Sequence, residues 1–169
     1  MMISIARPGA AVVVLFGASV ATAAAAGLGA GGHPDRSVTD RQVEQRLVGT
    51  WSLVSAATQD PAGRTISYPY GNHPAGKLTY TSSHNVWALV AKRDTPKALP
   101  ADAVWYTGMF DAHSRAGTVV HHVQYSNIPT FERTDLVRRY RFAGNRLTLT
   151  VSGAQSLVLT WQRTDRSGS

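Results

Sequence analysis

Residues 136–163 decide the fold, and they read LVRRYRFAGNRLTLTVSGAQSLVLTWQR. Apolar and polar residues alternate here with a period of two, which is typical of half-buried β-strands. Leu136–Phe142 and Arg146–Val151 are separated by Ala143–Asn145, a tight hairpin turn that contains a glycine. Ser156–Arg163 continues the same alternation as a third strand. The stretch therefore predicts three consecutive antiparallel strands.

The same alternation extends upstream. Six further strands are expected at Thr50–Ala57, Arg64–Tyr70, Lys77–Thr81, Val86–Ala91, Trp105–Ala112 and Thr118–Tyr125. Asp94–Asp102 carries two prolines and is expected to be a loop. No helix is predicted between the strands, so nothing provides the crossover that parallel neighbours need. We expect an all-β fold, a single antiparallel up-and-down β-barrel of about 8–10 strands, because closure removes the free edges.

A short helix is expected immediately before the barrel. Ser37 can cap it, Val43 and Leu47 lie one turn apart, and Gly49 ends it. The barrel domain is assigned to residues 38–165 and a disordered tail to residues 166–169.

The first 26 residues have the pattern of a signal peptide. Arg7 precedes an apolar run from Ala10 to Val20, and small residues follow. The run is too short for a stable membrane span, which makes an N-terminal anchor the weaker alternative. Cleavage is expected after one of three alanines: Ala23, Ala25 or Ala26. Residues 27–37 are glycine-rich and are expected to be a flexible linker. We therefore expect an exported protein, periplasmic or extracellular, without stable membrane insertion after cleavage.

The composition excludes several classes of function. The chain of 169 residues has no cysteine, which excludes disulfides, thiol nucleophiles and zinc sites built on cysteine. Its net charge is +7, but the basic residues are scattered and form no stripe, so nucleic acid is not an expected partner. Motifs for a serine-hydrolase elbow, a phosphate-binding glycine loop and a zinc protease helix are missing from the sequence.

Several segments carry a resemblance to a known family. Leu47–Ser55 (LVGTWSLVS) resembles the opening Gly-x-Trp motif of lipocalin-like barrels. Tyr68–Thr81, Gly117–Val123, Gly144–Leu149 and Leu159–Arg163 are similar to the small lipocalin-like domain family of bacteria and fungi. The resemblance covers about Leu47 to Arg163. It implies a calycin-type barrel with an internal cavity, and some relatives are isomerases or cyclases of biosynthetic pathways.

The resemblance also implies three structural residues. Gly49 and Trp51 belong to the opening motif, and the tryptophan is expected to pack at the closed end of the barrel. Arg163 shares its face with Trp161, so its guanidinium can stack across the Trp51 ring.

His121 and His122 are expected on opposite faces of one strand, because neighbouring strand residues alternate. His121 should point inward, either as a core histidine bonded to a neighbouring hydroxyl or as a group that moves a proton. A metal site would require His84, His113 or a carboxylate to converge. Those histidines lie in predicted turns, so no metal site is expected.

Arg138 shares a face with Leu136 and Tyr140 and should enter the barrel. A buried guanidinium needs a partner, which is either Asp111 or Glu132, or the carboxylate or enolate of a ligand. Aromatic residues on inward faces could form a binding pocket with hydroxyl groups or simply an ordinary barrel core. These residues are Tyr68, Tyr80, Tyr125, Tyr140 and Phe110.

Two hypotheses for function follow. In the first, the barrel binds a small apolar or anionic molecule, with Arg138 and His121 as polar anchors. In the second, it is an isomerase or cyclase without a cofactor, in which His121 moves a proton and Arg138 stabilises an enolate-like charge. Binding is favoured because the sequence offers no evident catalytic carboxylate pair or activated nucleophile, and no cofactor is expected in either case.

Overall fold

The computed structural model describes residues 38–93 and 103–164 of the chain. The predicted signal peptide, the linker, the loop at residues 94–102 and the tail at residues 166–169 lie outside the described residues. The described part contains the helix α1 (Val38–Leu47), the short 3₁₀ helix η1 (Pro129–Phe131) and nine strands. The strands are β1 (Gly49–Gln59), β2 (Thr65–Ser67), β3 (Pro74–Tyr80), β4 (Asn85–Lys92), β5 (Val104–His113), β6 (Thr118–Ser126), β7 (Asp135–Ala143), β8 (Arg146–Val151) and β9 (Ser156–Arg163).

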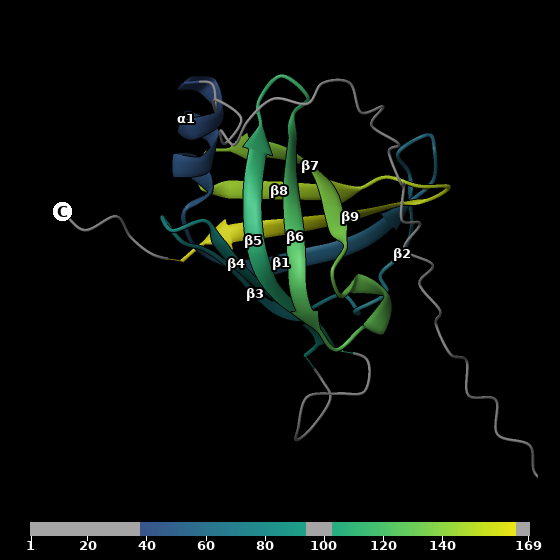
Figure 1. Ribbon diagram of the computed structural model, residues 1–169. Coiled ribbons are helices and arrows are strands. Elements are labelled where there is room, and N and C mark those ends of the chain that lie inside the picture. Colours follow the sequence, from purple (N-terminus) through teal and green to yellow (C-terminus); the bar gives the residue numbers. More distant parts are fainter. Residues whose placement is uncertain (1–37, 94–102, 165–169) are drawn as a thin grey trace, which may run out of the picture.

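Eight of these strands close into an antiparallel barrel. The order is β2-β1-β3-β4-β5-β6-β7-β8-β9, and β1 also pairs with β9, which completes the ring. The closing seam places Trp51 opposite Arg163 and Leu53 opposite Trp161. In Figure 1, β5 and β6 run across the front of the barrel, while β8, β9 and β1 pass behind them. The predicted all-β up-and-down barrel with a short preceding helix is confirmed.

Helix α1 packs at one end of the barrel (Figure 1). Its buried residues are Glu44 and Leu47, which lie at positions i and i+3 and therefore on the same side of the helix. This side is in contact with the barrel. The chain then turns sharply into β1 at Gly49, whose φ is +131°. L-residues with a side chain rarely adopt this conformation, which explains a glycine at this position. The helix ends at Leu47, two residues before the predicted end.

Strand β2 is shorter than predicted and does not reach Tyr70. It pairs only with the end of β1, beyond an irregularity between Thr58 and Gln59, and its residues are exposed. Pro69 has no N–H to donate to a neighbouring strand, and the chain turns at once, with Gly71 N–H donating to Tyr68 O. The turn leaves Tyr68 49% exposed and places Tyr70 in the core.

Strand β6 contains a β-bulge near its end. Val123 pairs with Gly108 and Tyr125 with Thr107, so Gln124 is an extra residue between them. Beyond the bulge the faces are exchanged, and Tyr125 is 65% exposed instead of pointing inward. Gly108 lies opposite the bulge because a Cβ there would overlap the carbonyl oxygen of His122.

Candidate functional site: a cavity beside a buried arginine

A cavity lies inside the barrel, toward the end where β4 finishes and β5 begins. Its free volume, measured for the centre of a water molecule, is about 30 Å³, which is room for about two water-sized groups. The cavity is partly open to solvent. Most of its wall is aliphatic or aromatic. The lining residues are Tyr70, Leu78, Ala88, Val90, Val104, Tyr106, Phe131, Arg138, Leu149, Val151, Leu157, Leu159 and Trp161.

Arg138 is the charged residue in this wall, and it is only 5% exposed. Its Nη1 donates to the carbonyl oxygen of Val137 at 3.2 Å. Within residues 38–93 and 103–164 no carboxylate forms an ion pair with its guanidinium. Asp111 contacts His122 on the outer face, and Glu132 is exposed. The internal ion pair considered for Arg138 is therefore not formed with either acid.

Trp161 also lines this cavity. Its indole ring is buried, and its Nε1 has no hydrogen-bond partner in the part of the chain that the structure describes. Buried N–H groups are nearly always satisfied, so an exception calls for an explanation. Because this nitrogen has almost no accessible surface, it does not face the open space, and Arg138 is the charged donor in a largely apolar wall.

His121 lies beneath the cavity wall and is fully buried. Its Nδ1 is hydrogen-bonded to the hydroxyl of Tyr106 at 2.8 Å and its Nε2 to that of Tyr80 at 2.7 Å. Burial lowers the pKa of His121 well below 6.5, and the positive charge of Arg138 lowers it further. The ring is therefore neutral near pH 7. This is the core histidine bonded to neighbouring hydroxyls, the first of the two roles considered for it.

The two tyrosines differ in position. Burial raises the pKa of both hydroxyls, so both are protonated near neutral pH. Tyr80 packs edge-on against Phe110, with 4.7 Å between ring centroids, and neither residue lines the cavity. Tyr106 does line it, beside Arg138, whose charge opposes the rise in the tyrosine's pKa.

Of the residues predicted to bind a ligand, only Arg138 lines the cavity. Tyr68 and Tyr125 were expected to point inward, and that expectation was wrong because of the turn at Pro69 and the bulge in β6. Tyr140 is on the expected inward face, but it is partly buried, 5.6 Å from the ring of Phe142, away from the cavity wall.

Four aromatic residues of the wall, Tyr70, Tyr106, Phe131 and Trp161, were not singled out from the sequence as ligand-binding. Tyr106 shares its alternation with Phe110, so the strand pattern already indicated an inward ring. Tyr70 falls after the turn that ends β2, where alternation no longer applies. Phe131 is in η1 and packs 6.4 Å from the Tyr106 ring. Its position depends on backbone pairing between Arg133 and Val123, which no local pattern shows.

The residues expected to be structural occupy the expected places. The guanidinium carbon of Arg163 lies 4.1 Å from the centroid of the Trp51 ring. Arg163 also donates to the carbonyl oxygens of Val48 and Arg46, and Trp51 Nε1 donates to Leu47 O at 2.9 Å. These contacts hold the end of α1 against β1 and β9, the two strands whose pairing closes the barrel.

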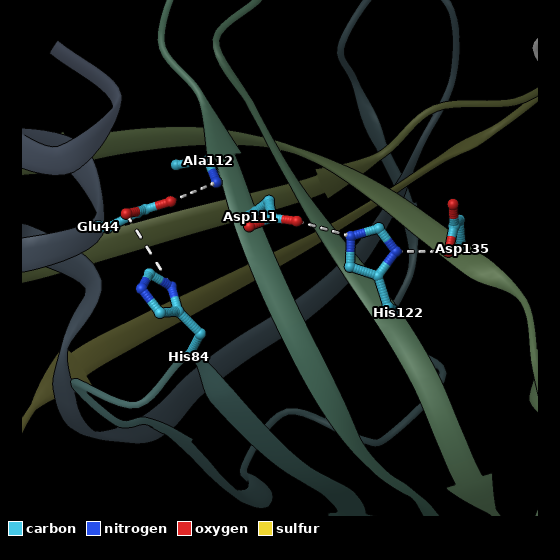
Figure 2. A network of polar contacts seen from close by, with 6 residues as sticks. All are labelled: Glu44, His84, Asp111, Ala112, His122 and Asp135. Carbon is cyan, nitrogen blue, oxygen red and sulfur yellow. Dashed lines mark hydrogen bonds and ion pairs between the residues drawn. The ribbon is translucent and has the colours of Figure 1, made fainter. Parts of the chain in front are cut away.

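His122 points out of the barrel, opposite to His121, as expected. Its Nδ1 is 2.7 Å from Asp135 and its Nε2 is 3.1 Å from Asp111 (Figure 2). Partial burial alone would lower the pKa of His122, but the two carboxylates outweigh this effect and raise it above 6.5.

A family model described as the lipocalin-like domain matches residues 48–164. The chain belongs to this family. The match begins next to the Gly-x-Trp motif and ends one residue after Arg163, so it spans the barrel. A lipocalin-like barrel with an internal cavity suggests binding of a small molecule. No curated protein matches the chain significantly. None of the helices in the described part of this lipocalin-like chain has the length and apolar character needed to cross a membrane.

Proposed function

We propose that this protein is an exported lipocalin-like barrel that binds a small anionic molecule in its cavity. The supporting observation is the buried guanidinium of Arg138, which has no carboxylate partner among the described residues. A buried charge without a partner is costly, and a ligand carboxylate or enolate would offset that cost with charge-assisted hydrogen bonds.

The rest of the cavity indicates the shape of the ligand. The side chains of leucines and valines in the wall favour an apolar body beside the acidic group. The enclosed space has room for about two water-sized groups and the cavity is partly open to solvent, so the proposal is a compact acidic head inside with an apolar body that extends toward the opening.

Export is proposed from the sequence of residues 1–26, with a basic residue, an apolar run and small residues in that order. An exported carrier would meet its ligand outside the cytoplasm.

One observation favours the alternative, an isomerase or cyclase without a cofactor. Tyr106 lines the cavity, and its hydroxyl is hydrogen-bonded to the neutral ring of His121. In that case Tyr106, and not His121, would exchange the proton with the substrate, and Arg138 would stabilise the charge of an enolate. Binding is favoured because it needs only the groups in the wall.

The test compares two probes of equal chain length, hexanoate and hexanol, by calorimetric titration. Hexanoate should bind and hexanol should bind more weakly. Arg138→Met should weaken hexanoate binding by about 30-fold or more, corresponding to at least about 2 kcal/mol for a desolvated charge pair. It should leave the melting temperature equal or higher, because it replaces an unpaired buried charge by an apolar side chain of similar volume.

Arg141→Met is the matched control, since Arg141 is on the same strand but exposed. This variant should bind hexanoate as the wild type does. Equal affinity of the wild type for both probes, or unchanged hexanoate binding by Arg138→Met, would exclude Arg138 as the anchor. Native mass spectrometry of protein recovered from the culture medium would then identify any ligand that copurifies.

A further inference from the structure

A second group of polar side chains lies outside the cavity, where α1 meets the barrel rim. It consists of Glu44 from α1, His84 from the turn between β3 and β4, and Asp111 from β5 (Figure 2). We call these three residues the rim cluster. One potential ligand atom from each residue lies within 4.8 Å of the other two. The three residues come from separate parts of the chain, and the fold brings them together.

Glu44 and His84 are held in place by the backbone of β5. Glu44 is buried, and its Oε1 accepts a hydrogen bond from the N–H of Ala112 at 3.3 Å. Its Oε2 is 4.0 Å from His84 Nδ1, too far for a hydrogen bond but close enough for both atoms to reach one cation. His84 has a φ of +62°, and its carbonyl oxygen accepts from the N–H of Phe110 at 2.9 Å. This turn is therefore fixed against β5.

Asp111 is oriented by a histidine and a second carboxylate. Its Oδ2 is 3.1 Å from His122 Nε2, and the other ring nitrogen of His122 is 2.7 Å from Asp135 (Figure 2). Hydrogen bonds of this kind, running outward from a ligand to a histidine and on to a carboxylate, orient the ligands of metal sites. One carboxylate oxygen of Asp111 belongs to the rim cluster.

We propose that the rim cluster is a binding site for a divalent transition metal, with Glu44, His84 and Asp111 as ligands. One imidazole and two carboxylates suit Zn²⁺ or Mn²⁺ better than Ca²⁺, which prefers oxygen ligands alone. Metal–ligand bonds of about 2.0–2.2 Å place ligand atoms about 3.3 Å apart in a tetrahedral site, so the distances between the ligand atoms shorten by up to about 1.5 Å on binding. Water would complete the coordination.

The position of the site indicates what the metal does. Its ligands come from α1, the β3–β4 turn and β5, so a bound ion cross-links the helix to the barrel wall. A metal site was not expected from the sequence, because His84 and His113 fall in turns. The fold brings His84 to the cluster, and His113 is exposed at the end of β5. This inference is independent of the ligand proposed for the cavity.

The test is a titration of ZnCl₂ into chelator-treated, tag-free protein, followed by calorimetry. The wild type should bind one Zn²⁺ per chain, and its melting temperature should rise with Zn²⁺. His84→Asn should weaken Zn²⁺ binding by about 100-fold or more, beyond the 10–100-fold typical of outer residues. Asparagine tolerates a positive φ, so this variant keeps the turn. Asp111→Asn should have a similar effect.

His113→Asn is the matched control, because it removes an exposed histidine that is not in the cluster. It should bind Zn²⁺ as the wild type does. The proposal is wrong if the wild type shows no stoichiometric binding, if His84→Asn and Asp111→Asn bind as tightly as the wild type, or if His113→Asn is weakened equally. Glu44→Gln should also lose binding. Because Glu44 is buried, the folding of the Glu44→Gln variant is checked by circular dichroism. If this variant does not fold, the His84→Asn and Asp111→Asn variants decide the test.

Discussion

Replacing Trp51 by alanine should destabilise the barrel by about 5 kcal/mol. Truncating a buried tryptophan typically costs about 3–5 kcal/mol, and Trp51 is only 1% exposed. Two contacts place the expected loss at the upper end of this range. The indole N–H bond to Leu47 O and the Arg163 guanidinium over the ring contribute about 1 kcal/mol each. Since domains of this size are stable by about 5–15 kcal/mol, the variant should be close to unfolding.

The assay is urea denaturation followed by far-ultraviolet circular dichroism, which does not depend on the tryptophan that is removed. Trp51→Phe should lose less, about 1–2 kcal/mol, because it keeps an aromatic ring but not the N–H donor. Trp87→Ala is the matched control, since Trp87 is 39% exposed on β4, and it should lose less than about 1 kcal/mol. A loss below about 1 kcal/mol for Trp51→Ala, or equal losses at both positions, would refute the reasoning.

Three further predictions concern other parts of the chain. The folded-state pKa of His121 is below its ordinary value of 6.5, so the contribution of His121 to stability should be fully present above pH 6.5 and should decrease as the pH falls below it, by about 1.4 kcal/mol per unit. In urea denaturation measured at several pH values, His121→Gln should reduce the dependence of the free energy of unfolding on pH below 6.5. An unchanged dependence would contradict the lowered pKa of His121. Gly108→Ala should cost about 1–3 kcal/mol in the same assay, because its Cβ meets the His122 carbonyl, and a neutral result would mean that the bulge is mobile. N-terminal sequencing of the exported protein should return a start between Ala24 and Gly27, and a start at Met1 would exclude cleavage.

The alternation of apolar residues predicted most strands and faces because one face of each strand is buried. It failed where the pairing itself is irregular. Tyr125 followed the inward pattern of β6, but the bulge at Gln124 depends on the opposite strand. A sign of this bulge was present in the sequence, since Gly108 interrupts an otherwise well-filled strand. At Tyr68 the chain leaves the sheet because Pro69 has no N–H to donate.

The candidate sites were predictable to different extents. Arg138 was correctly placed inside the barrel by its own strand. The alternation that turns Phe110 inward also turns Asp111 outward, so this acid could have been excluded as the internal partner. The rim cluster could not be predicted, because its three residues come from distant segments whose approach is set by the closed barrel and the docking of α1.

The hydrogen bonds of His121 have a consequence for selectivity. A neutral imidazole has one N–H donor and one acceptor, so the chain from Tyr106 to Tyr80 can run in only two directions. In one, the Tyr106 O–H donates a hydrogen bond to the ring, and only the oxygen of Tyr106 remains as an acceptor for a ligand. In the other, the ring donates to Tyr106, whose O–H is then free to point at a ligand. Moving one proton from one ring nitrogen of His121 to the other thus changes Tyr106 from an acceptor to a donor. The same residues can therefore bind a ligand with either a donor or an acceptor next to Tyr106.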